Sequence, residues 1–115
     1  MQLTLLGSAR GSLNWIDLGQ SNGEFFGLSA SFDDPRIGST RLAWIREVFA
    51  DNQYSLKWTR VWLRSGETHI FRSRDFAGQD RVFQLKAASI TGYTVEFYEI
   101  SVSTSNSGVD GGIYG

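Results

Sequence analysis

The chain has 115 residues, of which 41% are hydrophobic, 14% aromatic and 20% charged. This composition supplies enough apolar surface for one domain with its own core and argues against global disorder. Eleven basic and twelve acidic side chains give a formal charge of −1, so no net field attracts phosphate groups and non-specific nucleic-acid binding is disfavoured. Without cysteine, the chain forms no disulfide, thiolate metal site or cysteine nucleophile. We therefore expect no nucleic-acid partner and no cofactor.

The opening segment MQLTLLGSARGSLNW has a broken apolar run and no basic region before it, so it does not read as a signal peptide. No stretch approaches the roughly 18 consecutive apolar residues of a membrane helix. We expect no membrane partner. If the protein acts outside a cell, we expect it to arrive by another route, such as lysis or assembly into a particle.

Alternation of apolar and polar residues with a period of two is the dominant pattern, and it predicts strands. The first two are weak, at Gln2 to Leu6 and at Leu13 to Leu18. The third is clearer, because Phe26, Leu28, Ala30 and Phe32 alternate with Gly27, Ser29 and Ser31. The pattern predicts a strand with one buried face.

The segment from Thr40 to Phe49 is ambiguous. Leu42, Ile45 and Phe49 also suit one face of a helix, with Ser39 or Thr40 as its N-cap. We favour a strand, because Trp44, Ile45, Val48 and Phe49 prefer a pleated surface and the ADNQ that follows is a natural turn.

The strongest alternation is YSLKWTRVWL, Tyr54 to Leu63. The turn residues Ser65, Gly66 and Glu67 and the segment THIFRS follow, which predicts a hairpin through Gly66. Later strands are predicted at Val82 to Ala87 and from Tyr93 to Val102. In the latter, the apolar face switches near Phe97 and Tyr98, as a bulge would cause.

Tryptophan and arginine are concentrated in the central half of the chain, and together they supply binding energy at interfaces and stack on sugars. In a small sandwich tryptophan usually belongs to the core, which is the interpretation we favour over a surface role for Trp15, Trp58 or Trp62. Arg60 lies on the same predicted face as Trp58 and Trp62. Either this face is accessible and forms a Trp58–Arg60–Trp62 binding strip, or Arg60 is buried and paired with a carboxylate such as Glu47 or Glu96.

Candidate catalytic residues are few. His69 is the one histidine, and without cysteine it fits no usual structural zinc site, so we expect a half-exposed strand residue. Asp33 and Asp34 form the best carboxylate pair, but calcium binding and glycosidase chemistry both need further groups, and Asp-Asp-Pro is ordinary turn chemistry. No phosphate-binding glycine loop, zincin helix or dinucleotide fingerprint is present. We expect no catalytic and no metal-binding residue, and hence no enzyme.

The last eleven residues, SNSGVDGGIYG, hold four glycines and three apolar side chains. Such a composition is typical of a flexible tail. We expect residues 105–115 to form an extended arm that docks on a neighbouring subunit through Val109, Ile113 and Tyr114, outside a single domain at residues 1–104.

The sequence thus predicts an all-β fold, an antiparallel β-sandwich or jelly roll of about eight short strands with a glycine-rich C-terminal arm. The function we expect is a non-catalytic structural or assembly module of a virion or other extracellular particle, whose partners are copies of itself or other subunits. The alternative is a carbohydrate-binding module with glycans as partners, and it requires exposed, coplanar aromatic rings with polar side chains within hydrogen-bond reach.

Overall fold

The computed structural model describes residues 2–34, 40–49, 58–73, 78–88 and 92–101, and the structural statements below refer to these ranges. All regular structure in them is β-strand. The strands are β1 (Gln2–Arg10), β2 (Ile16–Ser21), β3 (Phe25–Phe32), β4 (Thr40–Phe49), β5 (Thr59–Arg64), β6 (Thr68–Arg72), β7 (Arg81–Ala87) and β8 (Tyr93–Ser101). Since the described residues form no helix, none of them belongs to a helix that could cross a membrane.

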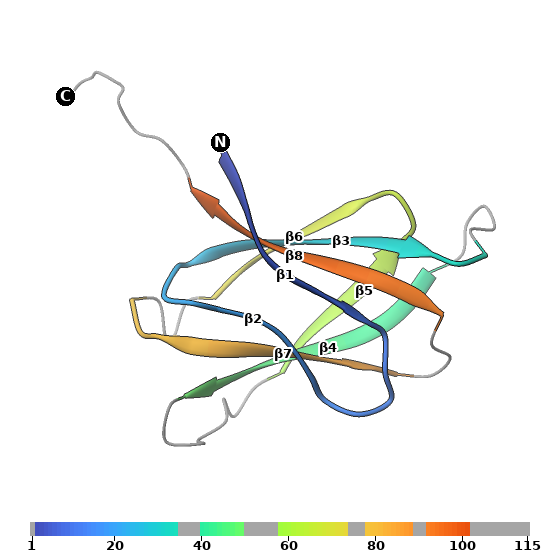
Figure 1. The fold of residues 1–115 in the computed structure, drawn as a ribbon, viewed down its shortest axis with the longest axis horizontal. Coiled ribbons are helices and arrows are strands. Elements are labelled where there is room, and N and C mark those ends of the chain that lie inside the picture. Colours follow the sequence, from blue (N-terminus) through green and yellow to red (C-terminus); the bar gives the residue numbers. More distant parts are fainter. Residues whose placement is uncertain (1, 35–39, 50–57, 74–77, 89–91, 102–115) are drawn as a thin grey trace.

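The strands form two four-stranded antiparallel sheets, in the orders β1-β8-β3-β6 and β2-β7-β4-β5. On the left of Figure 1 the first sheet lies above the second, and on the right the two sheets overlap in the view. Consecutive strands lie in different sheets, except for β4 and β5, which pair directly. The fold is therefore all-β and sandwich-like, with a shared core between the sheets.

Most of the predicted strands are confirmed, and the ambiguous segment from Thr40 to Phe49 is strand β4. The second strand begins at Ile16 rather than Leu13, and the first extends to Arg10. Of the predicted run from Tyr54 to Leu63, residues 54–57 lie outside the described residues, and β5 begins at Thr59. The predicted arm at residues 105–115 also lies outside the described residues, and with it Val109, Ile113 and Tyr114.

The predicted hairpin through Gly66 is wrong, although the turn itself is present. Gly66 has a φ of 82°, which glycine adopts without steric cost, and Glu67 N donates to Arg64 O across 3.1 Å. However, β5 and β6 belong to different sheets. The turn instead crosses the end of β3, where Gly66 N donates to Ala30 O across 3.0 Å. Turn residues specify that the chain reverses, and the sheet that the next strand joins depends on the core.

The predicted bulge in the last strand is also wrong. Strand β8 pairs with β3 in unbroken register, and the irregularity lies opposite it, between Leu5 and Gly7 of β1. The apparent switch arises because both sides of this strand carry apolar residues. Phe97 faces the core, and Ile100 lies on the outer side of the sheet, where it is still only 6% exposed.

Aromatic side chains fill the space between the sheets. Phe26 and Phe97 stack with their ring centroids 5.3 Å apart, and Phe83 from the opposite sheet lies 4.5 Å from Phe26 and 5.1 Å from Phe97. The predicted inward faces of β3 and β7 are confirmed, since every second residue of both strands is buried. Contacts across the two sheets are thus made mainly by phenylalanine and aliphatic side chains.

A buried arginine closes one end of this core. Arg81 is 1% exposed, pairs with Glu47, and donates to Gln79 O across 2.7 Å and Gly23 O across 2.8 Å. Ser73 Oγ accepts from Arg81 Nη2 and donates to Glu47 Oε1, each across 2.8 Å. The charge is therefore fully paired and hydrogen-bonded, as a buried ion must be.

We predict that Phe83→Ala lowers the free energy of unfolding by about 3–5 kcal/mol, because it leaves a cavity where three aromatic rings meet. Urea unfolding monitored by circular dichroism measures the change. The control Ile70→Ala removes a side chain that is 54% exposed and should cost less than about 1 kcal/mol. Equal losses in the two variants would contradict the position of the core.

Candidate functional site

All four tryptophans of the chain lie on the outer face of the β2-β7-β4-β5 sheet. Strand β4 buries Ala43 and Ile45, which places Trp44 on the opposite side. In the same way β5 buries Val61 and Leu63 and turns Trp62 outward. We call this surface the tryptophan face; its members are Trp15, Trp44, Trp58, Trp62, Asp17, Arg46, Arg60, Gln84 and Lys86.

Three of the indole rings form a continuous cluster. Trp58 meets Trp15 edge-on with ring centroids 5.1 Å apart, and Trp44 with centroids 6.2 Å apart. The planes cross at 77° and 59°, so these rings are not coplanar. Trp58 is nevertheless 51% exposed, and Trp62, which pairs with Leu42 across the strands, is 57% exposed. The face thus presents large indole surfaces to solvent.

A chain of polar contacts holds one ring of this cluster. The guanidinium carbon of Arg46 lies 4.3 Å from the centroid of Trp15, and Lys86 Nζ lies 6.0 Å from it. Arg46 Nε donates to Gln84 Oε1 across 2.8 Å, and Gln84 Nε2 donates to Asp17 Oδ1 across 2.8 Å. Strands β4, β7 and β2 each contribute one of these polar side chains, so the sheet register fixes the guanidinium over Trp15.

The structure decides between the two interpretations of the Trp58–Arg60–Trp62 strip. Arg60 is exposed, and Glu47, the carboxylate suggested for it, pairs with Arg81 instead. The favoured core position is wrong for Trp58 and Trp62, because Val61 and Leu63 take the inward side of this strand. The strip is accessible, and it forms the β5 side of the tryptophan face.

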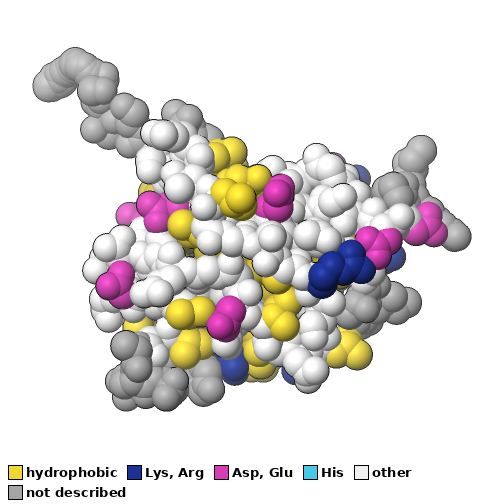
Figure 2. All heavy atoms as spheres, viewed as in Figure 1, with side chains coloured by type: hydrophobic (Ala, Val, Ile, Leu, Met, Phe, Trp, Pro, Cys, Tyr) yellow, Lys and Arg dark blue, Asp and Glu magenta, His cyan; other side chains and the backbone are white. Residues whose placement is uncertain are grey.

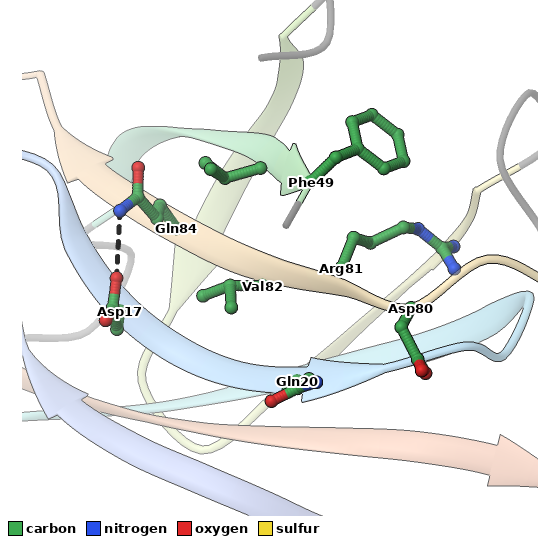
Figure 3. A pocket seen from close by; sticks show the side chains of 8 residues that line it. Asp17, Gln20, Phe49, Asp80, Arg81, Val82 and Gln84 are labelled. Atoms are coloured by element: carbon green, nitrogen blue, oxygen red, sulfur yellow. Dashed lines mark hydrogen bonds between the residues drawn. The ribbon is translucent and has the colours of Figure 1, made fainter. Parts of the chain in front are cut away.

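A hollow of about 300 Å³ lies farther along the same outer face. Figure 3 shows Val82 at its centre, the hydrogen-bonded pair Asp17 and Gln84 on one side, and Asp80 on the other. The full lining is Asp17, Gln20, Val48, Phe49, Asp80, Arg81, Val82 and Gln84. Carboxylates and amides over an apolar floor can hydrogen-bond a hydroxylated ligand.

His69 lies on β6, half-buried as predicted, and burial lowers the pKa of its imidazole. It lines a small hollow of about 70 Å³ together with Trp62, Leu63, Arg64, Glu67 and Thr68. This hollow is polar and opens beside the exposed Trp62 ring.

Of the neighbouring carboxylates Asp33 and Asp34, Asp33 is paired with Arg10 of β1. Asp33 accepts two hydrogen bonds from Arg10, with Nη1 to Oδ1 at 2.8 Å and Nη2 to Oδ2 at 2.7 Å. These hydrogen bonds lower the pKa of Asp33. Within the described ranges, no three His, Asp or Glu side chains gather where they could hold a metal ion. Asp33 thus joins β1 to the turn after β3.

No protein-family model, curated protein or solved structure matches this chain.

Sequence reasoning missed much of the tryptophan face. It named Trp58, Arg60 and Trp62 but not the partners Trp44, Arg46 and Gln84. A signal for β4 was present, because the inward positions Ala43 and Ile45 place Trp44 and Arg46 on the other side of the same strand. The contacts of these residues with β2 and β7 depend on the sheet order, which the sequence pattern does not contain.

We predict that Trp62→Ala lowers the free energy of unfolding by at most about 1 kcal/mol, because half of the indole is already in solvent. The neighbouring substitution Leu63→Ala, at a side chain 1% exposed, should cost about 2–5 kcal/mol. Chemical denaturation of the two variants side by side measures the difference. A loss of about 3 kcal/mol or more for Trp62→Ala would place that ring in the core.

Proposed function

We propose that this protein is a non-catalytic assembly module with a jelly-roll fold, and that its tryptophan face docks a neighbouring protein subunit in a virion or another extracellular particle. The observation that carries the proposal is the gathering of all four tryptophans on one outer sheet face, beside arginine and lysine side chains.

The strand order supports the jelly roll. A jelly roll has eight strands in two sheets joined by Greek-key connections. Two four-stranded sheets in which consecutive strands lie in different sheets, except for the directly paired β4 and β5, support this fold. Such folds occur in viral capsid proteins and in lectins, so the fold is compatible with subunit docking and with carbohydrate binding.

The composition of the tryptophan face supports a protein partner. Tryptophan and arginine are the residues that most often carry binding energy at protein interfaces. Trp58 and Trp62 are each more than half exposed, a large apolar area to leave in water. Arg46 is already held over Trp15, so part of the face is ordered before a partner arrives.

Ring geometry argues against the tryptophan cluster as a sugar platform. A flat platform needs coplanar rings with open faces, whereas Trp58 crosses Trp15 at 77° and Trp44 at 59°. One face of Trp15 is also occupied by the Arg46 guanidinium. Rings that meet edge to face are better suited to interdigitate with the side chains of a protein surface.

Carbohydrate binding remains the second candidate, because of the hollow beside the cluster. Its carboxylates and amides, Asp17, Gln20, Asp80 and Gln84, lie around an apolar floor, and Phe49 adds an aromatic ring. In this alternative the hollow, rather than the tryptophan cluster, would receive the glycan.

The predicted arm stays part of the proposal as a second docking element. Residues 105–115 supply Val109, Ile113 and Tyr114, and they follow β8 in the sequence. Deletion of residues 105–115 should leave the thermal transition nearly unchanged and weaken assembly.

The test compares molar masses by light scattering coupled to size-exclusion chromatography. We expect the full-length chain to assemble and Trp58→Ser with Trp62→Ser to reduce the assembly, because the substitutions remove the apolar contact area. Ile70→Ser is the matched control: it removes a similarly exposed apolar side chain from the other sheet and should leave the mass unchanged.

An unchanged mass for the double variant would contradict docking through the tryptophan face. A glycan array then tests the second candidate. Glycan binding that is lost in Gln84→Ala and kept in the tryptophan double variant would establish the hollow as a carbohydrate site.

A further inference from the structure

The first half of β1 is an open edge of the β1-β8-β3-β6 sheet. Within the described ranges, β1 pairs with β8 on one side and with no strand on the other. Residues Gln2 to Leu5 are all exposed, with Leu3 at 50% and Leu5 at 54%. The outward backbone N–H and C=O groups of such an edge can pair with another strand.

The open half of this edge lacks the charged side chains that usually prevent pairing. Charged residues, short length and bulges protect natural edge strands. Edge strand β2 carries Asp17, β5 carries Arg60 and Arg64, and the five-residue β6 ends at Arg72. In contrast, β1 has no charged residue before Arg10.

The second half of β1 is protected in another way. A Cβ atom at Gly7 would lie 2.0 Å from Leu18 O, so β2 crosses against β1 at this point. The register irregularity between Leu5 and Gly7 marks the same place. The exposed edge is therefore limited to the segment from Gln2 to Leu5.

An apolar patch on the outer face of the sheet adjoins this edge. The register aligns Leu3 with Ile100 and Phe25, and aligns Leu5 with Tyr98 and Gly27. The next row along the strands is polar, with Ser8, Glu96 and Ser29. Figure 2 shows hydrophobic side chains gathered over the start of β1 and the end of β8. The patch thus ends where the open edge ends.

We infer that a second copy of this chain pairs at this edge, β1 against β1 in antiparallel orientation, so that two sheets join into one of eight strands. A two-fold interface requires a surface that complements itself. An uncharged strand meets this requirement, since two copies bring no like charges together. With Thr4 near the two-fold axis, Leu3 of each copy lies opposite Leu5 of the other, and both apolar patches fall on the same side of the joined sheet.

This inference uses no part of the tryptophan face, which belongs to the other sheet. Each copy would then have a self-pairing edge in one sheet and a docking face in the other. Two different interfaces on one subunit extend an assembly beyond the dimer. Either interface can fail without the other.

The experiment measures the molar mass of the full-length chain by sedimentation equilibrium over a range of concentrations. It uses the double variant Leu3→Lys with Leu5→Lys, and the corresponding Leu3→Glu with Leu5→Glu. Both should lose the β1 contact and keep the wild-type thermal transition, because exposed positions tolerate charge. Like charges placed opposite each other across the two strands disfavour pairing.

An equimolar mixture of the lysine and glutamate variants should restore the contact, because opposite charges then meet across the two-fold axis. A general loss of solubility or stability would not be rescued in this way. Ile70→Lys, on the opposite edge strand of the same sheet, is the control and should associate as the wild type does. Amide hydrogen exchange should show protection of residues 2–5 on association, and the charged variants should lose it.

Several outcomes would overturn the inference: a wild-type chain that stays monomeric at every concentration, association that the lysine variant retains, or loss that the mixture does not rescue. Association that survives the β1 variants but is lost in Trp58→Ser with Trp62→Ser would place self-contact on the tryptophan face alone. That result would overturn the β1 inference and support the proposed function. The reverse result would support β1 pairing and contradict docking by the tryptophan face.

Discussion

The phenylalanine cluster between the sheets determines which side of each strand faces solvent. The ring centroids of Phe26, Phe83 and Phe97 lie no more than 5.3 Å from one another. These contacts pack β3 and β8 of one sheet against β7 of the other. Because side chains alternate along a strand, once these residues point inward their neighbours must point outward. Buried Arg81, paired with the partly buried Glu47, closes the end of the same core without leaving a charge unpaired.

This constraint produces the tryptophan face. Val61 and Leu63 fill the inward side of β5 and leave Trp62 outside, and Ala43 and Ile45 do the same for Trp44. The antiparallel register then places Arg46 beside Gln84, and Gln84 beside Asp17. Core packing thus determines which positions face outward. The sequence has tryptophan at several of these positions, where folding does not require a large aromatic residue, and the result is a surface suited to docking.

The sequence alone predicts the all-β class and the inward faces of β3 and β7, because strict alternation there admits one interpretation. It also favours a strand for β4 correctly, from the preference of Trp44 and Ile45 for a pleated surface. It fails at Trp58 and Trp62, where the general tendency of tryptophan to be buried competes with the better inward fit of Val61 and Leu63. The hairpin at Gly66 fails because a turn carries no information on which sheet the next strand joins. The contact of Arg46 with Gln84 cannot be predicted from the sequence, because it depends on the register between two strands that lie far apart in the chain.

If the tryptophan face docks a neighbouring subunit, Trp58 and Trp62 are exposed in the free subunit and covered in the assembly. Oxidative footprinting with mass-spectrometric readout, on dissociated and on assembled protein, measures this exposure in both states. Both tryptophans should react readily in the free chain and be shielded after assembly, while the buried Phe83 stays unreactive in both. Equal reactivity of Trp58 and Trp62 in the two states, or protection already in the free chain, would contradict this docking.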